Sequence, residues 1–272
     1  MGGKLFKQRK GKKPAEIRAV IFDGGGTIWD SSEGLYESYR WGFKQLGLNL
    51  PLSPEICHHL RGLRDFNTAK GIAKALLWAS RAFDCGESQL FLERPKANEY
   101  LKSKIQVYSE QNPSFPSLVM EMTQRFDEYL YNNVREETYP LLPHAREILK
   151  EIHKAGYQLA LVTIRRAFSA ERILKHHGLD RYFSHILSTE GYVGGGKGPG
   201  VARAVLSHLS MPPAQMLWVG DSAADISCAK EAGIRAVGIL TGLANRQTLL
   251  DEGADWILDD LGGLATLLDL YD

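Results

Sequence analysis

The feature that most constrains the fold of this chain is the recurrence of short apolar runs that end in polar residues or glycine. The runs lie at 18–23, 157–163, 185–189, 216–221, 235–239 and 255–258. Runs of this length and composition are typical of strands that are buried on both faces. Helical patterns separate the later runs; one apolar face extends from Ala145 to Ala155, between Pro143 and Gly156. Because strands and helices alternate, we predict an α/β fold with a doubly wound, Rossmann-like parallel sheet.

The alternation stops between residues 33 and 138. Only helical patterns occur in this stretch, and they lie at 34–46, 66–83, 95–110 and 116–133. An all-helical insertion after the first strand is positioned to act as a lid over the ligand side of a parallel sheet. The predicted domains follow from these patterns and are a basic disordered arm at 1–16, an α/β core at 17–32 and 139–272, and a helical cap at 33–138.

Composition and cysteine spacing exclude several classes of protein. Of the 272 residues, 44% are hydrophobic and 24% are charged, which is ordinary for a globular protein. No run approaches the roughly 18 apolar residues that a membrane span needs, so we expect no membrane partner. Cys57, Cys85 and Cys228 are far apart and form no C-x-x-C pair, which argues against a disulfide framework or a zinc site. The N-terminus lacks the apolar stretch of a secretory signal, and we expect a cytoplasmic protein.

The first 13 residues carry six basic side chains and no acidic one. A basic segment of this kind can hold a nucleic acid. More often a glycine-bearing terminus without apolar periodicity is a disordered, solubilising segment. We therefore do not expect a nucleic-acid partner.

Polar residues stand where the predicted strands end. Asp23 ends the first strand, Thr163 ends the second, Lys197 follows the third in a glycine-rich loop, and Asp221 and Asp225 follow the fourth. A single Asp after a strand is more often a helix cap or turn residue than a catalyst. Together these residues would converge on one crevice, where clustered carboxylates favour a hard cation such as Mg²⁺. The lysine and the hydroxyl would suit a phosphoryl group, and a carboxylate could attack phosphorus to form an aspartyl phosphate.

Several stretches resemble the haloacid dehalogenase (HAD) superfamily, and in particular its members with a helical cap inserted after the first motif. The matching stretches are 19–28 (AVIFDGGGTI), 159–163 (LALVT), 196–200 (GKGPG), 218–226 (WVGDSAADI), 229–234 (AKEAGI), 241–243 (TGL) and 253–257 (GADWI). The resemblance covers the whole predicted core, and the cap matches in placement. It implies a Mg²⁺-dependent hydrolase, most simply a phosphatase that acts on a small phosphorylated metabolite.

The resemblance also implies a role for each matching residue. Asp23 would be the nucleophile and a magnesium ligand, and Asp221 would be a second ligand. Thr163 would donate a hydrogen bond to the transferring phosphoryl group. Lys197 would neutralise the charge of the nucleophile and the phosphoryl group. Asp225 would hold Lys197 or a metal-bound water.

One departure from the family pattern concerns the proton donor. Family phosphatases carry a second Asp two positions after the nucleophile, which protonates the leaving group and later activates water. Gly25 occupies that position here. Its backbone carbonyl keeps the magnesium ligand that this position supplies in the family, but general acid–base catalysis, typically worth ~10²–10⁴-fold, is lost with the side chain.

Gly25 leaves three interpretations open. The chain could be a phosphatase in which another group, water or the substrate supplies the proton. It could have other chemistry, like the phosphonatases and dehalogenases of the superfamily. For a phosphonatase, Lys70 and Lys74 are candidate Schiff-base lysines by placement alone. It could also be a catalytically impaired protein that binds phosphate as a regulator. Asp23, Lys197, Asp221 and Asp225 are all present, which argues against a protein that only binds phosphate, because unused buried charges are costly.

Substrate selection is expected to depend on the cap. The segment 59–66 (HLRGLRDF) resembles a cap loop that reaches over the active site in relatives, and Arg61 and Arg64 are candidates for binding an anionic group of the substrate. They could equally be surface charges on a connection between helices.

Overall fold

The structure, a computed structural model, describes residues 6–7, 17–49, 53–54, 57, 60, 69–82, 94–135, 138–189 and 197–270. Its contacts divide the chain into two compact units. One unit consists of Met1–Ser31 and Arg135–Asp272, and the other of Ser32–Val134. The predicted insertion ends at residue 138, whereas Arg135 already belongs to the first unit. Its carbonyl accepts hydrogen bonds there from the backbone N–H groups of Thr138 and Tyr139.

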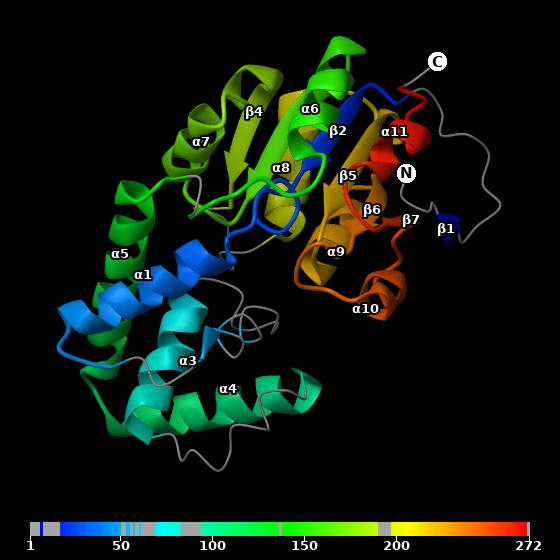
Figure 1. Ribbon diagram of the computed structural model, residues 1–272. Coiled ribbons are helices and arrows are strands. Elements are labelled where there is room, and N and C mark those ends of the chain that lie inside the picture. Colours follow the sequence, from blue (N-terminus) through cyan, green and yellow to red (C-terminus); the bar gives the residue numbers. More distant parts are fainter. Residues whose placement is uncertain are drawn as a thin grey trace. The chain divides into compact units, whose positions relative to one another are not determined.

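In the described part of the first unit, seven strands form one sheet in the order β1-β7-β6-β5-β2-β3-β4 (Figure 1). The strands are β1 (Phe6–Lys7), β2 (Ala19–Phe22), β3 (Gln158–Thr163), β4 (Phe183–Ser188), β5 (Met216–Gly220), β6 (Arg235–Ile239) and β7 (Trp256–Leu258). All neighbouring pairs are parallel except β1 and β7. The prediction of an α/β fold with a doubly wound parallel sheet is therefore confirmed. The chain runs from β2 to β3 on one side and later returns to β5 on the other, so the topological switch point lies beside β2.

Helices connect these strands and cover both faces of the sheet. They are α6 (Ala145–Lys154), α7 (Ala167–His176), α8 (Pro199–Leu209), α9 (Ala223–Glu231), α10 (Arg246–Asp251) and α11 (Gly263–Leu267), with 3₁₀ turns at Asp180–Tyr182 and Pro213–Gln215. Figure 1 shows α6 and α8 on opposite faces of the sheet. The predicted helix before the second run is α6, which buries Ile148, Leu149 and Ile152 and is followed by Gly156 at φ +84°.

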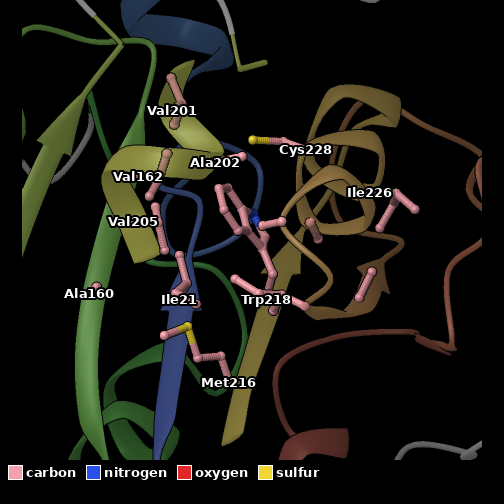
Figure 2. Packing of buried hydrophobic residues seen from close by; sticks show 14 of the residues in the cluster. Ile21, Ala160, Val162, Val201, Ala202, Val205, Met216, Trp218, Ile226 and Cys228 are labelled. Carbon is pink, nitrogen blue, oxygen red and sulfur yellow. The ribbon is translucent and has the colours of Figure 1, made fainter. Parts of the chain in front are cut away.

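The core between the sheet and helices α8 and α9 contains Trp218 at its centre (Figure 2). Side chains from β2, β3 and β5 face this layer, among them Ile21 and Val162. Every residue of β2 and of β5 is buried, as expected for strands of a parallel sheet that is covered on both faces. This rigid sheet supports the residues that follow its strands.

The second unit is helical in its described residues. It contains α1 (Ser32–Gln45), α3 (Ala69–Ala82), α4 (Arg94–Gln111) and α5 (Phe115–Asn132), which occupy the four spans predicted as helices. Phe43, Leu76 and Phe126 lie in a buried core of its own. The run Leu76–Trp78 is buried in this core.

The N-terminal segment differs in part from the expectation of a disordered arm. Phe6 and Lys7 form β1 and pair with Ile257 and Trp256 of β7, while the remainder of 1–16 lies outside the described residues. An unpaired sheet edge accepts a strand through backbone hydrogen bonds, which apolar periodicity does not reveal. No helix in the described ranges is long and apolar enough to cross a membrane.

Candidate active site

The register of the central strands brings the predicted polar residues to one edge of the sheet. Phe22 of β2 pairs with Leu161 of β3 and with Val219 of β5. The backbone N–H of Asp23 donates to the carbonyl of Val219 over 2.9 Å, which extends the pairing by one residue beyond β2. Thr163 ends β3 and Asp221 follows β5, so both emerge at the same carboxyl edge, beside the switch point.

Lys197 links two of the carboxylates. Its side chain is 4% exposed, and Nζ donates to Oδ1 of Asp23 and, over 2.5 Å, to Oδ1 of Asp225. The residue stands directly before α8, whose N-cap is Gly198 and whose first residue is Pro199. A buried ammonium between two carboxylates forms charge-assisted hydrogen bonds, which are stronger than those between neutral groups. The resemblance implies that Asp225 holds Lys197 or a metal-bound water, and its contact in the structure is with Lys197.

Asp225 is both a helix cap and a site residue. It is the third residue of α9, and its Oδ2 accepts hydrogen bonds from the backbone N–H and the hydroxyl of Ser222, the N-cap. The Ser222 hydroxyl in turn accepts from the N–H of Asp225, which completes a capping box. Oδ1 accepts from Lys197 and also from Nε1 of Trp218 over 3.3 Å. These bonds fix the orientation of the carboxylate that holds Lys197.

Asp221 is held by backbone groups. Its Oδ2 accepts a hydrogen bond from the N–H of Leu243 over 2.7 Å, and the residue is 2% exposed. A Cβ at Gly26 or Gly242 would collide with this carboxylate, so both positions require glycine for close packing. Gly26 also has φ +90°, a conformation that residues with a side chain rarely adopt. The N-terminal loop after β2 and the loop after β6 thus hold Asp221 between them.

The electrostatics of the cluster favour a bound cation. Burial raises the pKa of Asp23 well above its ordinary value, and Asp225 and Asp221 add to the rise while Lys197 opposes it. Burial lowers the pKa of Lys197, but the carboxylates of Asp225 and Asp23 outweigh this effect and raise the pKa overall. One oxygen from each of Asp23, Asp221 and Asp225 lies within 4.8 Å of the others. Three carboxylates against one ammonium leave negative charge that a metal with hard-ligand preference could offset, so the donor set fits such an ion.

Thr163 belongs to a further polar group at the end of β3. Its hydroxyl accepts a hydrogen bond from the backbone N–H of Arg165 over 3.1 Å, and its carbonyl accepts one from Thr189. The Arg165 guanidinium lies 4.9 Å from the ring centroid of Tyr139, and Nη1 donates to the Tyr139 hydroxyl over 3.4 Å. A positive charge therefore stands two residues after Thr163. Sequence reasoning missed Arg165 because its contact with Tyr139 joins residues 26 positions apart.

The loop that contains Gly25 is a tight turn closed by Trp29. The N–H of Ile28 donates to the carbonyl of Gly24 over 2.8 Å, and the N–H of Gly26 donates to that of Trp29 over 2.8 Å. The indole ring of Trp29 occupies the space of a side chain at position 24, where a Cβ would approach it to 2.5 Å. A Cβ at Gly25 would lie 2.6 Å from the hydroxyl oxygen of Ser31. The side-chain space at both glycines is thus filled by neighbours in the sequence.

The other predicted residues belong to the second unit or lie outside the described residues. Arg61 and Arg64 lie outside the described residues, as does 191–196 of the glycine-rich loop before Lys197. Lys70 is exposed and Lys74 half-buried on α3 of the helical unit. The contacts of Trp218 with Asp225 and of Ser31 with Gly25 were missed by sequence reasoning. The indole N–H at the start of the run Trp-Val-Gly-Asp is a signal that could have suggested the first of these contacts.

The sequence and the fold of this chain are similar to those of known hydrolases. The profile of a family described as haloacid dehalogenase-like hydrolase matches residues 20–239. The phosphoglycolate phosphatase of Salmonella typhi is 28% identical over 258 residues, which cover 95% of each chain. The phosphoglycolate phosphatase of Vibrio cholerae is 30% identical over 154 residues, covering 56% of this chain and 68% of the relative. A crystal structure from Haemophilus somnus, described as a predicted phosphoglycolate phosphatase, superposes with a TM-score of 0.70 at 22% identity, over 93% of this chain and 98% of that one.

Proposed function

The chain belongs to the haloacid dehalogenase-like hydrolases and is a phosphatase of that family, and from this premise we propose that it hydrolyses a small phosphomonoester with Mg²⁺ and with Asp23 as the nucleophile. The observation that carries the proposal is the buried ammonium of Lys197 between Asp23 and Asp225 at the carboxyl edge of the sheet. The names of the relatives make phosphoglycolate the first substrate to test.

The carboxylates of Asp23 and Asp221 and the backbone carbonyl of Gly25 would hold the magnesium ion. When bound, Mg²⁺ would offset the negative charge of these groups and of the phosphoryl group, so that Asp23 stays ionised despite its burial. Asp225 is committed to Lys197, Trp218 and Ser222 and acts through the lysine. This division of roles follows the hydrogen bonds of each carboxylate.

The first step is attack by Asp23 on phosphorus. A bond forms between the carboxylate oxygen and phosphorus while the bond from phosphorus to the leaving-group oxygen breaks, and the leaving oxygen keeps the electron pair. Lys197 and the Thr163 hydroxyl bind the phosphoryl oxygens as their charge shifts. Water then attacks the phosphorus of the aspartyl phosphate, Asp23 leaves as a carboxylate, and inorganic phosphate is released.

The test is phosphate release from para-nitrophenyl phosphate and a panel of alkyl phosphates that includes phosphoglycolate. Each substrate is assayed with Mg²⁺ and with excess chelator, beside Asp23→Asn. We expect metal-dependent turnover that falls at least ~10³-fold in Asp23→Asn, since the variant lacks the attacking carboxylate. Turnover that persists undiminished in this variant would refute the assigned nucleophile. No turnover of any substrate by the wild-type protein would refute the proposed function.

The two alternatives raised by Gly25 are not favoured. The relatives in the comparisons are named phosphatases, which does not support phosphonatase-like or dehalogenase-like chemistry or a protein that only binds phosphate. The cluster of paired charges also argues against an idle site, since a buried ion pair is costly to maintain.

A further inference from the structure

The proposed reaction needs hydrogen bonding at the leaving-group oxygen, and position 25 cannot supply it. When the bond from phosphorus breaks, the departing oxygen gains negative charge, and a donor placed there stabilises the transition state. Gly25 has no side chain, and the carboxylates of Asp221 and Asp225 are occupied by Leu243 and Lys197. A hydroxyl or N–H group beside the loop that follows Asp23 could supply this hydrogen bond.

The hydroxyl of Ser31 lies next to Gly25, in the loop that follows Asp23. Its oxygen is 2.6 Å from the position of a Cβ at Gly25, which is close to the separation between the Cβ of an aspartate and its own carboxylate oxygens. Ser31 belongs to the same compact unit as Asp23. Both residues are buried, Ser31 with 4% and Asp23 with 5% of its surface exposed. The Ser31 hydroxyl therefore lies beside the loop that follows the proposed nucleophile.

The indole of Trp29 supplies a second, independent observation. Trp29 is fully buried, and its Nε1 has no hydrogen-bond partner in the described part of the chain. This nitrogen lies 3.7 Å from the same Cβ position at Gly25. An unsatisfied buried N–H costs about 1–3 kcal/mol, so a buried donor of this kind is expected to serve an acceptor that binds beside it. Both donors therefore flank the position that lacks a side chain.

We propose that Ser31 is a catalytic residue whose hydroxyl takes the place of the side chain missing at Gly25, with the Trp29 N–H as the neighbouring donor. The inference rests on the proposed function. The Ser31 hydroxyl donates a hydrogen bond to the leaving-group oxygen as the bond to phosphorus breaks, and the departing alkoxide takes its proton from water. No net proton transfer to or from Ser31 is needed.

This arrangement makes the rate depend on the leaving group. A nitrophenolate ion departs without help because its charge is delocalised, whereas an alkoxide needs the donor. We expect Ser31→Ala to lower kcat about 10- to 100-fold on the alkyl phosphate that the wild-type protein hydrolyses fastest, which is the loss of one hydrogen bond to a charged group. On para-nitrophenyl phosphate the loss is expected to stay below about threefold. KM for both substrates is expected to change less than about twofold, since the bond forms in the transition state.

Two controls separate the hydroxyl from a structural effect. Ser31→Thr retains the hydroxyl and is expected to keep the alkyl phosphate activity within about threefold of wild type. Ser184→Ala removes a serine hydroxyl at the amino end of β4, opposite the site, and should leave the ratio of the two activities unchanged. Thermal melting of each variant shows whether the fold is kept. If Ser31→Ala does not fold, Ser31→Cys serves as the variant with a weaker donor and is expected to fall between alanine and wild type.

The outcomes distinguish the two proposals. A wild-type protein without Asp23-dependent turnover would overturn both. Asp23-dependent turnover in which Ser31→Ala leaves the alkyl-to-aryl ratio unchanged, or lowers both activities equally, would overturn the role of Ser31 alone. The role of Ser31 would also be overturned if the wild-type protein hydrolysed the aryl ester but none of the alkyl phosphates.

Discussion

The two sides of the candidate site differ in how completely their polar groups are paired. On one side, the Asp225 carboxylate accepts hydrogen bonds from Lys197, Trp218 and Ser222. On the other, the buried Oγ1 of Thr27 and Nε1 of Trp29 have no partner within the described ranges. In the proposed function, the first side would bind the phosphoryl group and the second would face the leaving group. The charged side chains on the first side are therefore paired, whereas position 25 on the second side has no side chain.

The difference has an energetic reason. Breaking a buried ion pair by removing one partner costs about 3–5 kcal/mol, because the remaining charge is left uncompensated. A neutral buried donor without a partner costs only about 1–3 kcal/mol. The side that holds Lys197 is therefore expected to tolerate little change, while the Gly25 loop folds without a carboxylate at position 25.

The largest effect is expected from Lys197→Met, which removes the ion pairs of Lys197 with Asp23 and Asp225. The variant keeps the length of the side chain but leaves Asp23 and Asp225 without their shared cation. We expect phosphatase turnover to fall at least ~10³-fold and the free energy of unfolding to fall by about 3 kcal/mol. Enzyme assays and urea denaturation measure the two effects.

Lys230→Met is the matched control for this variant. Lys230 pairs with Asp255 over 2.6 Å, but both side chains are about one-third exposed. An exposed ion pair contributes at most about 1 kcal/mol, so turnover should be unchanged and stability nearly so. If the two substitutions lowered the free energy of unfolding equally, the buried ion pair would contribute no more to stability than the exposed one, against this prediction.

Gly25→Asp is expected to have an intermediate effect, because it adds a carboxyl group on the side of the site that contains Gly25. The φ of Gly25 lies outside the left-handed range, so an L-residue fits the backbone, but Ser31 must rotate away from the new Cβ. We expect kcat on alkyl phosphates to rise about tenfold, which is less than a full general acid provides, because the Ser31 hydroxyl is displaced. The matched variant Gly25→Asn has the same shape without an ionisable proton and should show no gain. A fall in activity with aspartate would mean that the displaced Ser31 contributes more than the new carboxyl.

The smallest effect is expected from removing one indole N–H on each side. Trp218→Phe deletes the donor to Asp225 and should lower kcat about threefold and stability by about 1–2 kcal/mol. Trp29→Phe deletes a donor that has no partner in the described residues, so its effect on stability should be smaller. Chemical denaturation of the two variants compares them directly. If Trp29→Phe lost more stability than Trp218→Phe, the Trp29 N–H would have a hydrogen-bond partner in solution. The difference in pairing between the two sides of the site would then be smaller.

Much of the fold could be predicted from the sequence because the responsible patterns are local. The apolar runs and helical periodicities correspond to the strands and helices observed in both units, with ends displaced by a few residues. The fold class follows from their alternation. The pairing of β1 with β7 could not be predicted, because Phe6 and Lys7 carry no apolar alternation and the pair forms through backbone groups.

The sequence by itself determined that Asp23, Thr163 and Asp221 share one edge, since parallel strands that end in polar residues present those residues together. It also determined that position 25 lacks a side chain. Only the tertiary structure decided that Trp218 donates to Asp225, that two loops enclose Asp221, and that the Ser31 hydroxyl stands beside Gly25. These contacts depend on side-chain directions and on the path of each turn, which the spacing of residues along the chain does not specify.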